Sequence, residues 1–195
     1  YREPGLDRYW VPSNVDSLLF GTKMADAWVQ VAQGGDIAFI SAALLRLEEL
    51  GRLDQAFIAE KSAGWADLRA ALSGRSIDEF LAMSGATRDE LETFCAMYGG
   101  AKSAVLIWSM GITHHEFAVD NVRALVNLAL ARGNVGRDGA GLMPRQPAQP
   151  RSDGLLRDRG ARAAQRLGVA EFGLELGKRL GTPTQIGSAR EDTDP

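Results

Sequence analysis

The two histidines of this chain, His114 and His115, stand side by side and are its first candidates for metal binding or acid–base chemistry. On a helix, adjacent side chains point about 100° apart, whereas a two-histidine metal site places its ligands four positions apart. Glu116 or Asp120 could supply one carboxylate, but this stretch of sequence offers no third strong ligand. The histidine pair therefore does not predict a self-contained metal site.

Two other residues could act as nucleophiles, and neither has the expected surroundings. Ser109 lies in Trp-Ser-Met-Gly, which lacks the small-x-Ser-x-small pattern of a nucleophile elbow. Cys95 lies on the apolar side of a predicted amphipathic helix, which favours a buried small hydrophobic residue over a reactive thiol. As the only cysteine, it also cannot form an intrachain disulfide or hold a cysteine-rich metal cluster. The sequence therefore does not support hydrolysis.

A third interpretation is that the histidines lie on a ligand-binding loop. Gly111 falls between a predicted strand over 104–108 and an amphipathic helix predicted from Phe117 to near Gly133. At the carboxyl ends of such strands, backbone N–H groups and the helix dipole favour an anion such as a pyrophosphate. His114 would then be a polar contact to the ligand. The alternative is that Met110-Gly111 only makes a tight turn.

The segment Gln33-Gly34-Gly35-Asp36 repeats this arrangement. An extended piece over 27–32 precedes the two glycines, and the apolar spacing predicts a helix from Asp36 that stops at Gly51. Asp36 is either the N-cap of that helix or a carboxylate that accepts hydrogen bonds from the N1–H and N2–H₂ groups of guanine. Two such turns in one chain favour a nucleotide-like ligand.

The elements that position these residues are mostly helical. The continuous apolar run 104–108 predicts a strand buried on both faces, and 133–144 carries four glycines in nine residues, which lets backbone amides approach a ligand. Strand, glycine turn and helix together predict an α/β fold. Further helices are predicted after Ser13-Asn14, over 54–61, 64–72 and 76–83, and from the capping box Thr87–Glu90 to Gly99-Gly100.

Composition excludes several classes of protein. With 195 residues and 45% hydrophobic residues, the chain is long enough for a globular core. A net charge of -3 and a pI near 5.5 argue against a nucleic-acid-binding protein. No apolar run reaches the roughly 20 residues that span a bilayer, so we expect no membrane insertion and a cytoplasmic location.

The motifs described above resemble those of the molybdopterin oxidoreductases, and in particular the formate-dehydrogenase-like alpha subunits. The likeness covers about residues 1–144 and implies a helix-rich fragment of a Rossmann-like cofactor-binding domain. It is carried, in order, by 20–26, 34–39, Trp108-Ser-Met-Gly-Ile-Thr-His-His115, 120–130 and Arg132-Gly-Asn-Val-Gly-Arg-Asp-Gly-Ala-Gly-Leu-Met-Pro144.

The resemblance implies a bis(molybdopterin guanine dinucleotide) cofactor with molybdenum, for which this chain supplies the guanine-dinucleotide wall. The metal ligand and any 4Fe-4S ligands are expected upstream of what corresponds to Tyr1, in the remaining domains of a parent enzyme; Cys95 matches neither. Position 114 is usually glutamine in the family, so His114 is a departure. The cofactor-binding residues that match the family are Gly34, Gly35, Asp36, Met110, Gly111, Ile112, Thr113 and His114.

After Pro144 the likeness stops. The family continues with an Arg-Gly motif, whereas here Arg145 is followed by Gln-Pro-Ala-Gln-Pro, so Arg145 is assigned no catalytic role. The Arg/Ala/Gly-rich composition predicts that 145–195 is an atypical tail produced by a frameshift or truncation, with helical periodicity only over 169–180. The alternative function is a non-enzymatic or degenerate α/β module with no bound cofactor.

Overall fold

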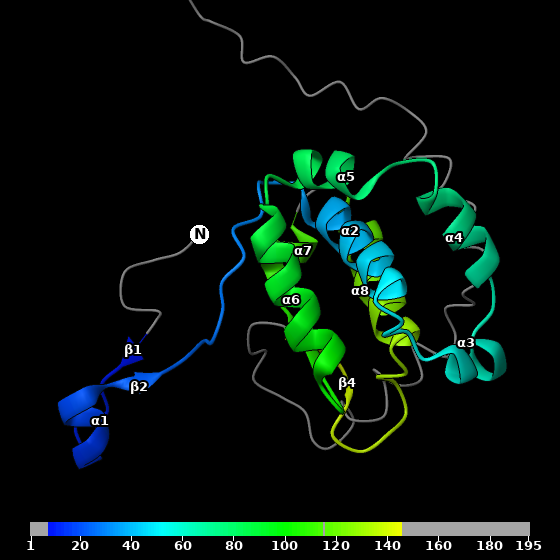
Figure 1. The fold of residues 1–195 in the computed structure, drawn as a ribbon. Helices are drawn as coiled ribbons and strands as arrows, with labels where there is room; N and C mark the ends of the chain where they lie inside the picture. Colours follow the sequence, from blue (N-terminus) through cyan, green and yellow to red (C-terminus); the bar gives the residue numbers. More distant parts are fainter. Residues whose placement is uncertain (1–7, 115, 146–195) are drawn as a thin grey trace, which may run out of the picture.

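The computed structural model describes residues 8–114 and 116–145, and the predictions for 145–195 fall outside this range except at Arg145. Figure 1 shows a body of helices with a small parallel sheet at one side and an N-terminal hairpin. The helices are α1 Val15–Phe20, α2 Asp36–Glu49, α3 Gln55–Lys61, α4 Trp65–Leu72, α5 Ile77–Ser84, α6 Arg88–Gly100, α7 Met110–Thr113 and α8 Ala118–Ala131. The strands are β1 Arg8–Tyr9, β2 Thr22–Lys23, β3 Val105–Trp108 and β4 Gly141–Pro144.

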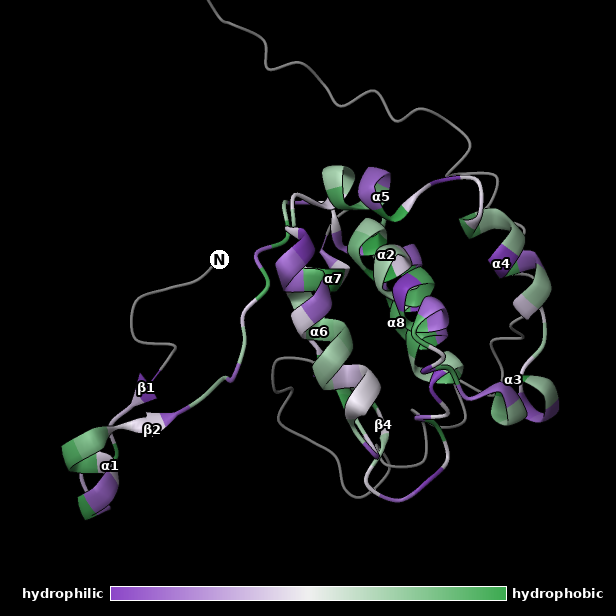
Figure 2. Cartoon of the chain, in the orientation of Figure 1, coloured by the Kyte–Doolittle hydropathy of each residue, from purple (hydrophilic) through white to green (hydrophobic). Residues whose placement is uncertain are grey.

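Helix α2 is the centre of the core. It packs against α5, α6 and α8, and its apolar side chains cover most of its circumference, as expected for a buried helix (Figure 2). Leu47, Phe80, Leu91 and Leu128, one from each of these four helices, are almost completely removed from solvent. The core therefore joins segments that are far apart in sequence around one helix.

The direction of the elements decides where the candidate site lies. Helices α2 and α8 pack together, and the Asp54 N–H that follows α2 donates to the carbonyl of Ala131 at the end of α8, at 2.9 Å. The two helices therefore run the same way, as Figure 1 shows by colour. Strand β3 leads at its carboxyl end into α7, and β4 pairs parallel to it. The starts of α2 and α8 and the ends of β3 and β4 consequently meet at one end of the body.

Most of the helices predicted from the sequence are confirmed. Thr87 and Ser76 each form a capping box with a glutamate three residues later, and Asn14 caps α1. The α/β class is also confirmed, since β3, α8 and β4 form a strand–helix–strand unit with a parallel pair. The narrower assignment to a Rossmann-like domain stays a prediction.

Two predictions need correction. Gly35, not Asp36, is the N-cap of α2, and Asp36 is its first helical residue. Strand β3 is not buried on both faces: Val105 and Ile107 are 44% and 62% exposed, because β4 is its only strand neighbour among the described residues and the packed helices cover one face. Segment 27–32, predicted only as an extended piece, lies outside the helices and strands. The turn after β3 contains the helical turn α7, and the glycine segment ends in the unpredicted strand β4.

No helix within residues 8–114 and 116–145 has both the length and the apolar character needed to cross a membrane.

Candidate cofactor-binding site

The first predicted loop is exposed at the end of β3. Its backbone makes one helical turn, with the His114 N–H donating to the Met110 carbonyl at 2.8 Å. Met110, Gly111, Thr113 and His114 are exposed, and Ile112 is half-buried. A Cβ atom placed on Gly111 would have no neighbour within 4 Å. A ligand can therefore approach the Gly111 backbone without displacing protein atoms.

The two glycines of the second predicted turn, Gly34 and Gly35, have different structural roles. Gly34 has a φ of +80° and open space around it, so it makes the turn itself. Gly35 is buried, and a Cβ there would lie 2.8 Å from the Cα and carbonyl oxygen of Ser84. Gly35 thus allows the start of α2 to pack on the end of α5. Gly34 is exposed and Asp36 is half-buried, so both remain within reach of a ligand.

The structure brings these two predicted segments to the same end of the body. We call residues 33–36 and 109–117 the loop end, leaving out the undescribed residue 115. Helices α2 and α8, each 14 residues long, begin here, and their N-cap residues Gly35 and Phe117 provide no side-chain cap. Helices α3, α5 and α6 begin with side-chain caps at Asp54, Ser76 and Thr87, whereas α4 and α7 begin without one, as α2 and α8 do. Uncapped first-turn N–H groups and two helix dipoles of one direction make the loop end suited to an anion such as a phosphate.

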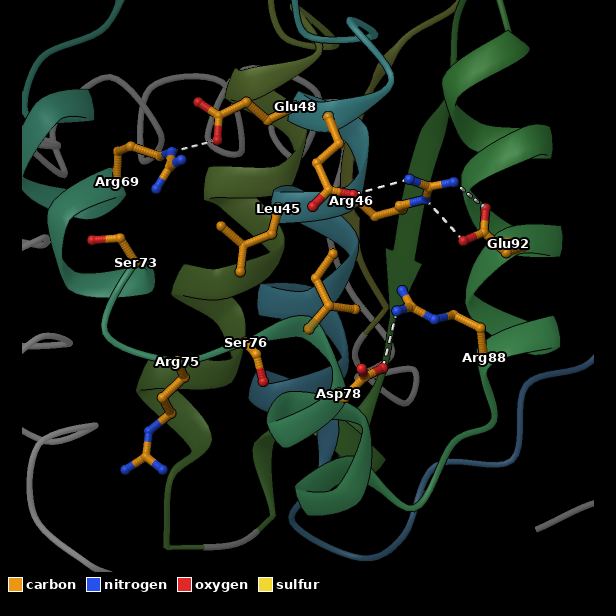
Figure 3. A pocket seen from close by; sticks show the side chains of 12 residues that line it. Leu45, Arg46, Glu48, Arg69, Ser73, Arg75, Ser76, Asp78, Arg88 and Glu92 are labelled. Atoms are coloured by element: carbon orange, nitrogen blue, oxygen red, sulfur yellow. Dashed lines mark hydrogen bonds and ion pairs between the residues drawn. The ribbon is translucent and has the colours of Figure 1, made fainter.

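A separate groove lies between α2, α4, α5 and α6 and shares no residue with the loop end (Figure 3). Its volume is about 540 Å³. The side chains that line it pair with one another: Arg46 with Glu49 and Glu92 at 2.9 and 2.8 Å, Arg88 with Asp78 at 3.0 Å, and Arg69 with Glu48. We call this the charged groove. Because its carboxylates already neutralise these arginines, it is a poorer anion site than its arginine content suggests.

Comparison with known proteins gives the family. No protein-family model matches the chain. Protein YdeP of Shigella flexneri is 31% identical over 194 residues, which is 93% of this chain and 25% of that protein. Formate dehydrogenase H of Escherichia coli K12 and the F420-dependent formate dehydrogenase 2 subunit alpha of Methanococcus maripaludis are each 31% identical over 122 residues, or 63% of this chain. The chain is a homologue of the molybdopterin oxidoreductases of the formate dehydrogenase type.

The chain spans a quarter or less of the length of these relatives: 25% of YdeP, and 17% and 18% of the two formate dehydrogenases. An alignment over 93% of a 195-residue chain also extends past residue 144 wherever it starts. The likeness to YdeP thus includes part of the segment 145–195, and the origin of that segment by frameshift or truncation stays a prediction.

Cys95 has the surroundings of a packing residue in this oxidoreductase homologue. Its side chain is buried between α2 and α6, and its Sγ lies 3.9 Å from the carbonyl of Ala43. Burial raises the pKa of the Cys95 thiol to about 12, so it stays protonated at neutral pH. The expectation of a buried cysteine is confirmed. Within residues 8–114 and 116–145, no group of three or more His, Cys, Asp or Glu residues is arranged to hold a metal ion.

One important polar cluster was missed by the sequence interpretation. Asn134 is buried; its Oδ1 accepts from the Ala104 N–H at 3.3 Å and from Arg137 at 2.8 Å, while its Nδ2 donates to the Tyr98 hydroxyl at 3.0 Å. Arg132 and Arg137 also donate to the carbonyls of Ala101 and Lys102 at 2.9 and 2.6 Å. Through these bonds the two arginines fix the segment that leads into β3. The asparagine directly after the helix-ending Gly133 was the available signal.

Proposed function

We propose that this chain is part of a molybdopterin-dependent oxidoreductase of the formate dehydrogenase type, and that its loop end contributes the wall for the guanine-dinucleotide part of a bis(molybdopterin guanine dinucleotide) cofactor. Homology supports the enzyme class. The observation that carries the cofactor role is the meeting of two uncapped 14-residue helices, each preceded by a predicted glycine turn, at the end where β3 stops.

The chemistry of the loop end fits a dinucleotide. Gly111 offers open space over backbone N–H groups, which suits a pyrophosphate. The Asp36 carboxylate would repel a phosphate but can accept two hydrogen bonds from the N1–H and N2–H₂ groups of guanine. Thr113 and His114 are exposed polar contacts, and histidine can donate and accept hydrogen bonds where the family pattern has glutamine.

When bound, molybdenum in such a cofactor takes the changes of oxidation state during substrate turnover. The role proposed for this chain is to bind and orient the dinucleotide, with Asp36 selecting guanine and the Gly111 turn receiving phosphate oxygens. The metal ligand, any 4Fe-4S cluster and the substrate contacts are proposed to come from other domains of a longer enzyme, consistent with the part of its relatives that the chain spans.

Calorimetry with GMP and GDP tests this proposal. We expect weak binding to the 195-residue chain, with a Kd of about 1 mM, because one wall contacts one side of the ligand. Gly111→Val fills the space in front of the loop and should reduce the affinity at least about tenfold, a loss of ~1.4 kcal/mol. Gly100→Val is the matched control, since Gly100 is also exposed with open space around its Cβ position but lies at the end of α6.

Equal affinities for the parent, Gly111→Val and Gly100→Val would reject the site assignment. Absence of any heat with both nucleotides, together with a thermal midpoint that ignores them, would favour the alternative of a module without cofactor.

Base selection gives a separate test of Asp36. The isosteric Asp36→Asn replaces one acceptor oxygen with a donor, so its preference for GMP over AMP should fall about tenfold or more. An unchanged preference would exclude Asp36 from reading the base, whatever the affinity for phosphate.

A further inference from the structure

The candidate loop, residues 110–114, forms a single helical turn that is stabilised by few backbone hydrogen bonds of its own. The Ile112 N–H donates to the Ser109 carbonyl at 3.2 Å, and the His114 N–H to the Met110 carbonyl at 2.8 Å. Ser109 provides no side-chain cap, and none of the residues of α7 is buried. A single turn is unfavourable in isolation because its few bonds do not offset the entropy of fixing the backbone. The turn therefore depends on contacts from elsewhere in the protein.

Asn121, in the first turns of α8, provides such a contact. Its side chain is 0% exposed, and its Nδ2 donates to the carbonyl of Ile112 at 3.1 Å. The carbonyls in the last turn of a helix have no partner within that helix, so this bond satisfies one that α7 cannot satisfy itself. The Asn121 N–H donates to the Phe117 carbonyl at 2.9 Å, which anchors the asparagine on the start of α8.

We propose that Asn121 is the positioning residue of the candidate cofactor loop: its buried amide holds residues 110–114 in the single-turn conformation that presents Gly111 to the nucleotide. It acts through Ile112 and does not itself touch the ligand. The ligand part of this inference rests on the proposed function. The loop-holding part rests only on the burial of Asn121 and its bond to Ile112.

Residue-resolved hydrogen exchange on the full 195-residue chain tests the proposal. Asn121→Leu keeps a similar side-chain volume and removes the donor. We expect exchange at the Ile112 and His114 amides to become about tenfold faster, as expected for the loss of one buried hydrogen bond. Exchange in the middle of α2 and α8 should stay within about twofold of the parent, because the core packing is retained.

Asn127→Leu is the matched control, since Asn127 is also a buried asparagine of α8 and lies further along the helix, away from α7. This variant should leave the exchange rates of the Ile112 and His114 amides unchanged. Unchanged exchange at these amides in Asn121→Leu overturns the proposal. An equal acceleration in Asn127→Leu overturns it as well, because the effect would then be a general loosening of α8.

A measurement on the unaltered chain covers the case in which Asn121→Leu does not fold. The side-chain N–H protons of Asn121 should exchange at the rate of the Ile112 and His114 amides, since one opening event would expose all three. If they exchange as fast as those of the exposed Asn14 while the loop amides stay protected, the proposal is overturned.

Titration with GMP separates this inference from the proposed function. If exchange in the loop rises in Asn121→Leu but neither parent nor variant binds GMP, the positioning role of Asn121 holds and the nucleotide function fails. If GMP binds the parent and Asn121→Leu equally although the loop has loosened, Asn121 does not position the loop for a ligand.

Discussion

The loop end and the charged groove both bring polar groups together, but the two regions differ in whether those groups have partners within the protein. In the charged groove, Arg46, Arg69 and Arg88 each pair with a carboxylate. Of the helices around it, α5 and α6 start with capping boxes and α4 starts without a side-chain cap. At the loop end, α2 and α8 start with no side-chain cap. Polar groups that are already satisfied stabilise the fold, whereas unsatisfied ones at a surface can serve a ligand. The comparison therefore supports the proposal that the loop end binds a ligand and that the groove stabilises the fold.

The largest effect should come from the apolar core on which α5, one of the helices around the charged groove, packs. Phe80 of α5 is fully buried against the core, so Phe80→Ala should lower the free energy of unfolding by about 3–5 kcal/mol. Met83→Ala is the control on the same helix, because Met83 is exposed. Urea denaturation measures both. A small loss for Phe80→Ala would mean that the ion pairs, not the core, hold the groove together.

A smaller effect should distinguish the two kinds of glycine at the loop end. Gly35→Ala forces a Cβ against the backbone of Ser84, 2.8 Å away, and should cost about 1–3 kcal/mol of stability. Gly111→Ala meets no atom within 4 Å and should change stability by no more than about 0.5 kcal/mol. Thermal denaturation of the two variants compares them directly. If Gly111→Ala is as destabilising as Gly35→Ala, then Gly111 is required for folding and its openness is no argument for a ligand.

A third prediction concerns the segment that leads into the loop end. Glu90 accepts hydrogen bonds from the N–H groups of Thr87 and Gln30 at 2.8 and 3.1 Å, and these bonds lower its pKa below the ordinary value of 4.5. A carboxyl group whose pKa is lower in the folded than in the unfolded state stabilises the fold above about pH 4.5 and loses that contribution as the pH falls through the folded pKa. Glu90→Gln should therefore be less stable than the parent at pH 7, with a difference that shrinks below about pH 4.5.

Urea midpoints measured between pH 7 and about pH 3 check this prediction. Glu60→Gln serves as the control because Glu60 is exposed on α3. A constant difference between Glu90→Gln and the parent across this range would show that the loss comes from packing and not from the charge.

The smallest effect is expected at the rim of the charged groove. The Arg88–Asp78 pair is largely exposed to solvent, so Arg88→Gln should cost less than about 1 kcal/mol, and added salt should remove most of that cost. Denaturation at low and high ionic strength measures it. A loss of several kcal/mol in the free energy of unfolding would mean that this exposed ion pair stabilises the fold as much as the apolar core does.

Local signals in the sequence predicted the helices well, because caps and apolar spacing act within a few residues. Thr87 with Glu90 and Asp54 before α3 are examples. The position of Asp36 was missed by one residue, since its type suits an N-cap but Gly35 is needed against Ser84. That contact joins residues far apart in sequence and leaves no local pattern.

The sequence marked the candidate site residues, whose binding role stays a prediction, but not the residues that support them. Glycine turns before helices marked 34–36 and 110–114, and the direction of α2 and α8 brought them to one end. The buried amides of Asn121 and Asn134 were not predicted, because an asparagine on a helix or after a glycine is usually an exposed residue. Strand β4 was not predicted because it lies in a glycine-rich segment of weak strand propensity. Pairing with β3 stabilises it as a strand.

The most direct test is to titrate GMP into isotope-labelled chain and map the backbone amides that respond by NMR. Our account predicts shifts at Gly34, Asp36, Gly111, Thr113 and His114, with the charged groove around Arg69 and Arg75 unaffected. Shifts confined to the charged groove, or none anywhere up to several millimolar GMP, a range in which even a Kd of about 1 mM would be seen, would contradict the assignment of the loop end as the nucleotide-binding wall.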